Sequence, residues 1–526
     1  MSQIDVNDLT FYYEGSPDNI FEHVSFSVDT DWKLGLIGRN GKGKTTFLHL
    51  LLGKYEYIGS IRTAAAFDYF PYQVPAAGLE RCGAELMEDW KPDCESWRVL
   101  RELKRLELDA EVFYRPFGTL SHGERTKVML AVLFSGNHDF LLVDEPTNHL
   151  DQTSREAVKT YLAGKKGFIL VSHDRDLLDA CIDHVLVLNR QTIEVQSGNF
   201  SSWWENKRRK DACSRVENEK HLKEIAALQK AAARSRQWAD KSEQSKIGVD
   251  PVRDPEHRAK KPYIGMKTKK MQSRVRQMEQ RISREIEAKE GLLKDVEEIA
   301  GLKMMPLTHH KDCLIRAEGY GLWYGDAETP VFDGLCFSLH RGERVFLKGG
   351  NGCGKSSLIK AVLAGCAKDR EQAMREKNLR EKGTLAMASG LVISCVEQDT
   401  SFLRGSIREF CAARGLEESL FCAVLRQLDM ERGQFAKPME DYSEGQKKKV
   451  LLAASLLTPA HLYIWDEPLN YIDVFSRMQI EKLILSCRPT MLVVEHDVRF
   501  RETIATKVVE VQVWHRKHMG TGIVQQ

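Results

Sequence analysis

The chain has 526 residues, several times the size of a typical domain, so its length predicts two or three compact units. Its 42% of hydrophobic and 29% of charged residues exclude a disordered chain and predict a soluble globular protein. The 77 basic and 75 acidic side chains almost cancel, but residues 201–300 hold 25 basic and 17 acidic ones. This local excess of +8 places a basic segment between two mildly acidic ends.

The sequence has no feature that directs it to a membrane or out of the cell. Its longest uncharged stretches are shorter than the roughly 20 residues that cross a bilayer, and no basic start is followed by an apolar run. We therefore expect no membrane domain and a cytoplasmic location. The 12 cysteines include no C-x-x-C pair, which argues against zinc ribbons, iron-sulfur clusters and a disulfide framework, and predicts reduced, mainly buried thiols.

An internal repeat begins with two phosphate-binding loops, GRNGKGKT at 38–45 and GGNGCGKS at 349–356. Each loop follows an apolar run and precedes a helix-like segment, as a strand-loop-helix unit requires. In such a unit the backbone N–H groups of the loop surround the phosphates, and the lysine contacts the outer phosphates. Cys353 is expected to be accessible to thiol reagents when ATP is absent. The residues expected to bind ATP here are Gly38, Arg39, Asn40, Gly41, Lys42, Gly43, Lys44, Thr45, Thr46, Gly349, Gly350, Asn351, Gly352, Cys353, Gly354, Lys355, Ser356 and Ser357.

Two further motifs follow in each copy, in the same order. LSHGE at 120–124 corresponds to YSEGQ at 442–446, and the apolar strands FLLVDE and LYIWDE each end at two carboxylates. Parallel sheets hold ligands at the carboxyl ends of their strands. We assign Asp144 and Asp466 to a metal ion and Glu145 and Glu467 to the attacking water.

These motifs resemble those of ABC-type ATPases, whose usual signature is LSGGQ; His122 and Glu444 replace its first glycine. The resemblance implies Q-loop glutamines, D-loop aspartates and switch histidines in both copies, and head-to-tail closure around two ATP molecules with Mg²⁺. Half-buried strand tyrosines without a ligand remain an alternative for the two adenine-stacking positions. The residues implied are Tyr13, Gln73, Ser121, Gly123, Asp151, His173, Tyr324, Gln398, Ser443, Gly445, Asp473 and His496, with Thr45, Gln73, Asp144, Ser356, Gln398 and Asp466 at the metal.

The basic segment between the two copies predicts two long antiparallel helices with a tip near 249–263. Residues 221–280 hold 15 basic and 7 acidic side chains, a pattern that suits insertion along RNA phosphates. A solvated coiled-coil spacer is the plain alternative. The candidate RNA-contacting residues are Arg253, Arg258, Lys260, Lys261, Lys267, Lys269 and Lys270.

Two cassettes with a long helical linker resemble the ABC-F proteins. VSHDRDLLD, SGNFSSWW, YIWDEPLNYIDVF and MLVVEHD resemble the Lsa group of antibiotic-resistance proteins in that family. This implies a ribosome partner, with the linker reaching large-subunit RNA from the tRNA exit site toward the peptidyl-transferase centre, and protection against lincosamides, pleuromutilins and group A streptogramins. No obligate protein partner is expected. A housekeeping ABC-F translation factor and the fused ATPase subunit of an importer are the alternatives.

Together these features predict an α/β fold with two P-loop ABC-type ATPase domains joined by a long antiparallel helical hairpin. The expected boundaries are 1–200 for the first cassette, 201–308 for the linker, 309–510 for the second cassette and 511–526 for a short tail.

Overall fold

The computed structural model describes residues 3–13, 19–39, 41–136, 139–148, 150–189, 192–244, 273, 277, 281–282, 304–325, 327–366, 369–428 and 430–512. The chain divides into two compact units, Met1–Ser201 with Ala300–Gln526, and Ser202–Ile299. The linker tip, the seven candidate RNA-contacting residues and Asn40 lie outside the described residues.

The first cassette combines a three-stranded antiparallel sheet with a larger, mainly parallel one. The antiparallel sheet has the order β2-β1-β4, with β1 at Gln3–Phe11, β2 at Phe21–Asp29 and β4 at Ile58–Arg62. The larger sheet has the order β5-β6-β7-β3-β8-β9, and all its neighbours are parallel except β8 and β9. Its strands are β3 (Lys33–Ile37), β5 (Ala66–Phe70), β6 (Asp139–Asp144), β7 (Phe168–Val171), β8 (His184–Leu188) and β9 (Ile193–Ser197).

The strand order of this sheet positions the catalytic motifs. The short apolar runs of β3 and β7 are almost fully buried, as expected for strands covered on both faces. β7 pairs with both β3 and β6, so the loops after these three strands share one edge. The first P-loop, the carboxylates after β6 and the switch histidine after β7 therefore emerge side by side.

The helices of the first cassette begin at residues suited to that role. Ser121 and Glu124 form a capping box at the start of α4, and Asp151 and Asp174 cap α5 and α6. The helices are α1 (Lys44–Leu51), α2 (Gly83–Trp90), α3 (Ser96–Arg105), α4 (His122–Leu133), α5 (Gln152–Ala163) and α6 (Arg175–Cys181), with short 3₁₀ turns at Ala76–Glu80, Ala110–Tyr114 and Phe117–Thr119.

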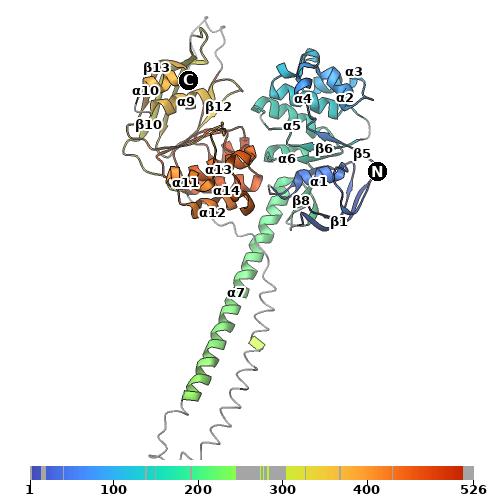
Figure 1. Ribbon diagram of the computed structural model, residues 1–526, viewed down its shortest axis with the longest axis vertical. Coiled ribbons are helices and arrows are strands. Elements are labelled where there is room, and N and C mark those ends of the chain that lie inside the picture. Colours follow the sequence, from blue (N-terminus) through green and yellow to red (C-terminus); the bar gives the residue numbers. More distant parts are fainter. Residues whose placement is uncertain are drawn as a thin grey trace, which may run out of the picture. The chain divides into compact units, whose positions relative to one another are not determined.

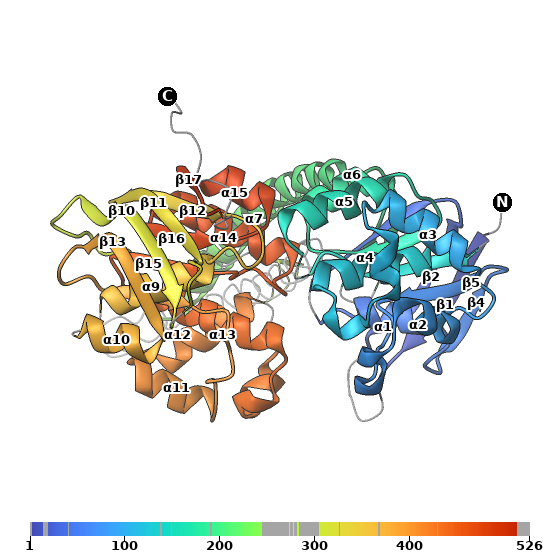
Figure 2. The same ribbon diagram turned by 90° about the horizontal axis from the view of Figure 1, so that it is seen from above.

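The second cassette repeats this plan. Its antiparallel sheet, β11-β10-β13, contains β10 (Cys313–Tyr324), β11 (Phe332–His340) and β13 (Leu379–Met387), and β13 packs against α9 and α10 (Figure 2). Its parallel sheet has the order β14-β15-β16-β12-β17, with β12 (Arg344–Lys348), β14 (Ile393–Val396), β15 (Leu462–Asp466), β16 (Met491–Val494) and β17 (Lys507–Glu510).

Helices surround the second parallel sheet, and its core is rich in large side chains. Trp465 on β15 is fully buried and donates its indole N–H to Ser455 Oγ at 2.9 Å, so its polar atom is satisfied. The helices are α9 (Lys355–Gly365), α10 (Arg370–Glu376), α11 (Ile407–Arg414), α12 (Glu418–Gln427), α13 (Glu444–Leu457), α14 (Val474–Cys487) and α15 (Val498–Ile504), with 3₁₀ turns at Arg432–Ala436 and Met439–Asp441.

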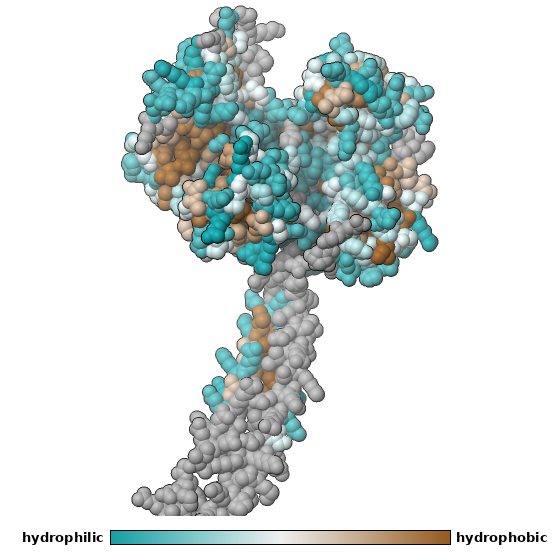
Figure 3. Space-filling model, in the orientation of Figure 1, coloured by the Kyte–Doolittle hydropathy of each residue, from teal (hydrophilic) through white to brown (hydrophobic). Residues whose placement is uncertain are grey.

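The linker begins with α7, a continuous helix of 45 residues at Phe200–Gln244 (Figure 1). At 1.5 Å per residue its length is about 68 Å. The first predicted linker helix is therefore present, while most of the second lies outside the described residues. Ile225 on α7 and Ile282 are buried, as expected for positions on an apolar seam, whereas Val216 and Leu222 are exposed. Figure 3 shows hydrophobic side chains on part of the surface of α7. Among the described helices, none is both long and apolar enough to cross a membrane.

Candidate functional site: two composite nucleotide cavities

The P-loop lysines are held inside their own loops. Lys44 Nζ donates to the carbonyl of Gly38 at 2.7 Å, and Lys355 Nζ donates to the carbonyls of Gly349 and Gly350, both at 2.8 Å. Burial lowers the pKa of Lys44, although nearby acidic groups oppose this effect. Each ammonium group thus lies among the backbone groups that surround phosphates in such loops.

Two glycines make the turn from each loop into its helix possible. Gly43 and Gly354 precede α1 and α9 with φ angles of +86° and +97°. A Cβ atom at Gly43 would lie 2.6 Å from Ile20 Cγ2, and one at Gly354 would lie 2.5 Å from Val331 Cγ1. Both the left-handed backbone and the close approach therefore require glycine.

The hydroxyl and carboxylate assigned to the metal lie together in the first cassette. Thr45 Oγ1 donates to Asp144 Oδ2 at 3.0 Å, and the same oxygen accepts a bond from the Tyr69 hydroxyl at 3.1 Å. Burial raises the pKa of Asp144, and these two hydrogen bonds oppose the shift. Tyr69 was not predicted from the sequence; its position four residues before Gln73, on the strand that leads to the Q-loop, is the only signal that could have indicated it.

The second cassette presents the equivalent oxygen ligands in a different setting. Burial raises the pKa of Asp466 to about 6, although a hydrogen bond with Ser356 opposes the shift. Asp466 Oδ1 is buried and has no hydrogen-bond partner, which leaves a carboxylate oxygen available to a cation. Hydroxyl, carboxylate and amide oxygens are the hard ligands that Mg²⁺ prefers, so the residues fit this ion.

The Q-loop glutamines differ between the copies. Gln398 lines the second cavity, and its Nε2 donates to Glu467 Oε2 at 3.2 Å. Gln73 is exposed and is not among the described residues that line the first cavity. The structure therefore brings Gln398 into contact with Glu467, whereas Gln73 does not line the cavity of its own cassette.

Each glutamate assigned to the attacking water faces the histidine assigned as the switch in the same cassette. Glu145 Oε1 lies 3.3 Å from His173 Nε2, and Glu467 Oε1 lies 3.5 Å from His496 Nε2. Both glutamates have positive φ angles, 51° and 48°. Non-glycine residues avoid this region, and the strain is stored at the equivalent position in both copies.

The two glutamates have different acidities. Burial, together with the neighbouring Asp144 carboxylate, raises the pKa of Glu145 to about 8. For Glu467, burial acts in the same direction, but the adjacent His496 imidazole and nearby lysines outweigh it, so its pKa lies below the usual value. Burial and the positive charge of Lys44 hold the pKa of His173 well below the ordinary value, which keeps this imidazole neutral.

The first nucleotide cavity contains groups from both cassettes. Its volume is about 1040 Å³, enough for a nucleotide. The P-loop side contributes Lys44, Thr45, Glu145 and His173. The residues that face them from the second cassette are Met430, Glu431, Gln434, Ser443, Glu444, Gly445, Gln446, Lys449 and Tyr471.

The second cavity, of about 760 Å³, mirrors the first with one difference. Lys355, Ser356, Glu467 and His496 line it, and the first cassette contributes His122 and Arg155. Ser121 and Gly123, assigned to this site from the sequence, are not among its described lining residues. His122, which replaces the usual glycine of the signature, is thus the signature residue that lines this cavity.

The signature serines also have a local structural role. Ser121 Oγ accepts from the Glu124 N–H at 3.2 Å while Glu124 accepts from the Ser121 N–H at 2.8 Å. Ser443 and Gln446 form the equivalent capping box at α13. Each signature is therefore the start of a helix, whose free N–H groups favour an anion.

The two tyrosines expected to stack on adenine stand in matching positions. The Tyr13 hydroxyl lies 2.8 Å from Thr46 Oγ1, and the Tyr324 hydroxyl lies 2.7 Å from Ser357 Oγ. Tyr13 lines the first cavity and Tyr324 the second, and the two residues are 40% and 39% exposed. Each ring is tied to the helix after its P-loop and keeps an exposed surface.

The D-loop aspartates are helix caps. Asp151 accepts a hydrogen bond from the Ser154 N–H at 2.9 Å, and the fully buried Asp473 accepts from the N–H groups of Phe475 and Ser476 at 3.0 Å. Asp151 also lines a third cavity, of about 450 Å³, with Gly349 and His496. In that cavity the D-loop of the first cassette faces the P-loop and switch histidine of the second.

Cys353 corrects two expectations about the cysteines. Its side chain is 1% exposed, and its Sγ lies 3.9 Å from Lys355 Nζ, so the thiol points into the protein and the predicted accessibility is wrong. All 12 cysteines are free, but only Cys181, Cys353 and Cys411 are buried, so the expectation of mainly buried thiols is also wrong.

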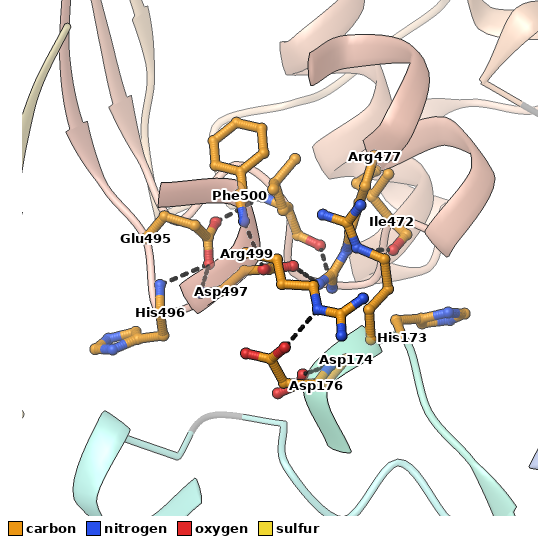
Figure 4. A network of polar contacts seen from close by, with 12 residues as sticks. His173, Asp174, Asp176, Ile472, Arg477, Glu495, His496, Asp497, Arg499 and Phe500 are labelled. Carbon is orange, nitrogen blue, oxygen red and sulfur yellow. Dashed lines mark hydrogen bonds and ion pairs between the residues drawn. The ribbon is translucent and has the colours of Figure 1, made fainter. Parts of the chain in front are cut away.

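A buried ion network supports the switch histidine of the second cassette (Figure 4). Arg477 Nη1 donates to Asp497 Oδ2 at 3.0 Å, and its other donors bond the carbonyls of Ile472 and Leu469 at 2.9 Å. In the first cassette Arg155 lies 3.6 Å from Asp174, the same pair. Neither pair was predicted from the sequence, although an arginine follows each D-loop aspartate by four residues and an aspartate follows each switch histidine.

Comparisons with known proteins concern the family and the fold of the chain. A family profile described as "ABC transporter" matches residues 21–148 and 332–470. The chain is 28% identical over 511 residues to the ribosome protection protein VmlR of Bacillus subtilis, covering 94% of this chain and 85% of VmlR. It is 25% identical to the ATP-binding protein Uup of Caulobacter vibrioides, with 93% and 74% of the two chains covered.

The fold is also similar to solved structures. An archaeal ribosome recycling factor, aABCE1, solved with the ribosomal stalk protein aP1, has a TM-score of 0.58 and 18% identity, with 96% of this chain and 87% of that chain covered. A structure titled RNase-L Inhibitor has a TM-score of 0.57 with the same identity and coverage. These likenesses concern the fold alone and cover nearly the whole chain.

Proposed function

The chain belongs to the ABC ATPase family, in its ABC-F branch, and hydrolyses ATP to ADP and phosphate; we propose that it uses this activity to protect the ribosome from antibiotics. The observation that carries the proposal is the similarity to a ribosome protection protein over 94% of the chain. The basic linker, with 15 basic and 7 acidic side chains in residues 221–280, supports an RNA partner. A ribosome partner also implies a cytoplasmic location.

For hydrolysis, Glu145 and Glu467 act as general bases toward the attacking water, and His173 and His496 position the γ-phosphate and the water. Lys44 and Lys355 stabilise the charge that develops on the transferred phosphoryl group. Thr45 with Asp144, and Ser356 with Asp466, would hold Mg²⁺, which would supply positive charge against the phosphate oxygens.

We assign one ATP to each cavity, so that two molecules are bound per chain. The signature helix at Ser443 faces the first P-loop in one cavity, and this arrangement lets a γ-phosphate connect the cassettes. Loss of the γ-phosphate after hydrolysis removes this connection and allows the cassettes to separate. Binding and hydrolysis would thus alternate between a closed and an open state.

The proposed target of the linker is the large-subunit RNA between the tRNA exit site and the peptidyl-transferase centre. α7 alone extends about 68 Å, a length suited to reaching a distant site. The motif resemblance to the Lsa group extends the proposal to lincosamides, pleuromutilins and group A streptogramins. The residues proposed to contact RNA are those near the tip, at 253–270.

The test is co-sedimentation of an E145Q/E467Q variant with ribosomes. We expect ATP, and not ADP, to keep this variant bound, because it retains the phosphate ligands and lacks the two bases. The same variant without residues 249–263 is the matched control and should bind weakly. Failure of the full variant to co-sediment would contradict the ribosomal assignment.

The drug spectrum needs a separate test. Expression of the wild-type chain in a drug-sensitive host should raise tolerance to the three drug classes, and deletion of residues 249–263 should abolish this effect. Unchanged susceptibility, with ribosome binding retained, would favour the housekeeping translation factor. The chain is also similar to relatives described only as ATP-binding proteins, Uup and the 26% identical YheS of Escherichia coli, and these names carry no resistance function.

A further inference from the structure

The two cassettes contain an equivalent short helix that follows the switch histidine. α6 and α15 each have seven residues, and each begins directly after an aspartate cap, Asp174 or Asp497. Because the switch histidines His173 and His496 are equivalent, Asp176 and Arg499 occupy the same position, the second residue of the helix. The repeat thus contains opposite charges at one equivalent position.

These two equivalent residues contact each other (Figure 4). Arg499 Nε donates to Asp176 Oδ1 at 2.5 Å, and the same guanidinium pairs with Asp179 at 2.5 Å and bonds Ser201 Oγ at 3.2 Å. In a two-fold pairing of like units, a residue on the axis meets its own copy. The contact between Asp176 and Arg499 therefore marks the pseudo-two-fold axis of the cassette pair.

A second ion pair beside this axis has no counterpart. Arg175 donates to both carboxylate oxygens of Glu481, with Nη1 at 3.2 Å from Oε2, and both side chains are 8% exposed. The positions equivalent to Arg175 and Glu481 in the opposite cassettes are Val498 and Lys159, which cannot form an ion pair. Lys159 instead pairs with Glu156 of its own helix at 2.6 Å.

Pairing of like cassettes would turn both contacts into unfavourable ones. Two first cassettes would oppose Asp176 to Asp176 and Arg175 to Lys159. Two second cassettes would oppose Arg499 to Arg499 and leave Glu481 buried against Val498. Like charges in contact, or a buried charge without a partner, cost more than the original pair contributes.

We propose that the charges on α6, α14 and α15 select the partner of each cassette: a first cassette docks on a second cassette, and pairing of two like cassettes is excluded. A buried ion pair contributes little to stability but can specify register and partner. Specificity here comes as much from the repulsion in the wrong pairs as from attraction in the right one. This selection of partners does not depend on the ribosomal function.

The first test exchanges the charges on the axis in the full-length chain. The single variants D176R and R499D place like charges in contact, and we expect each to lose ATPase activity about tenfold and to melt at least about 3 °C lower. The double variant D176R/R499D restores opposite charges on the axis but leaves Asp179 beside the substituted carboxylate at position 499, so it should recover part of both values. A double variant no better than the single ones would overturn the proposal.

A matched control separates this effect from general damage to a surface pair. Arg370 and Glu381 form an ion pair of 2.7 Å inside the second cassette, 35% and 31% exposed, close to the 33% and 27% of Arg499 and Asp176. R370E and E381R should leave the ATPase activity within about twofold of the wild type, because this pair lies away from the cassette contact. Equal losses in both sets of variants would count against the proposal.

Partner choice is tested by co-expressing the D176R chain with the R499D chain. Within each chain the charges on the axis repel. If the two chains exchange cassettes, one cassette pair contains both substituted positions, which then carry opposite charges. The other cassette pair contains the native Asp176 and Arg499. We expect a particle of twice the 60.0 kDa chain mass, with ATPase activity restored, in the mixture and in neither single variant. A mixture that stays at the mass of one chain and inactive would overturn the proposal.

Discussion

Glu145 Oε1 lies 3.3 Å from His173 Nε2, and the same atoms of Glu467 and His496 lie 3.5 Å apart. The two sites nevertheless differ in charge state. Burial and the Asp144 carboxylate raise the pKa of Glu145 to about 8, whereas at Glu467 burial is outweighed by the adjacent His496 imidazole and two lysines, which lower the pKa. A general base acts only when deprotonated, so the two sites should respond differently to pH.

The first prediction follows from this difference. An E467Q variant, which retains Glu145, should gain ATPase activity as the pH rises from about 7 through about 8, because the raised pKa keeps this carboxyl protonated below that range. An E145Q variant, which retains Glu467, should show nearly constant activity over the same interval. Steady-state phosphate release at constant ionic strength measures both. Superimposable profiles would contradict the assignment of different acidities.

Tyr69 should tune the metal site of the first cassette only. Its hydroxyl donates to Asp144 Oδ2 at 3.1 Å, and the equivalent position on β14 is Ser394, which bonds Ser455 instead. Loss of such an outer hydrogen bond weakens metal binding by about tenfold, so Y69F in an E467Q background should need that much more Mg²⁺ for half-maximal activity. Y69F in an E145Q background is the control and should leave the Mg²⁺ requirement unchanged.

Arg477 should be important for stability. It is 6% exposed and pairs with Asp497, which is 2% exposed, so R477M leaves a buried carboxylate without its partner. The expected cost is about 3–5 kcal/mol in the free energy of unfolding. R155M removes the looser equivalent pair, 3.6 Å apart, and should cost less. Chemical denaturation measures the free energy of unfolding of the two variants. An equal decrease in both would show that burial does not increase the contribution of the Arg477 pair to stability.

Cys353 should resist thiol reagents with or without ATP, because its side chain is 1% exposed and does not line the second cavity. Cys213, Cys336 and Cys366 are exposed and should react under the same conditions, which makes them internal controls. Mass spectrometry of peptides after brief labelling distinguishes the sites. Rapid labelling of Cys353 that ATP suppresses would contradict the buried position.

Features that depend on a few adjacent residues could be predicted from the sequence. The P-loops require glycines at fixed steps, as the φ angles and close approaches of Gly43 and Gly354 show. Apolar runs such as FLLVD predict buried parallel strands, and their order along the chain predicts two repeated α/β units. The long linker helix followed from its composition and spacing in the same way.

Features that depend on residues distant in the sequence were decided only by the tertiary structure. Glu145 and Glu467 sit in the same local sequence, DEP, yet their pKa values shift in opposite directions, because burial and neighbouring charges differ between the sites. The burial of Cys353 and the bond of Tyr69 to Asp144 likewise depend on how strands and helices pack.

The sequence by itself determined the two ATPase repeats and their local chemistry, since these follow from short-range geometry. Packing between segments hundreds of residues apart determined the charge state of each site and the contact of Asp176 with Arg499, because long-range electrostatics and burial exist only in the folded chain.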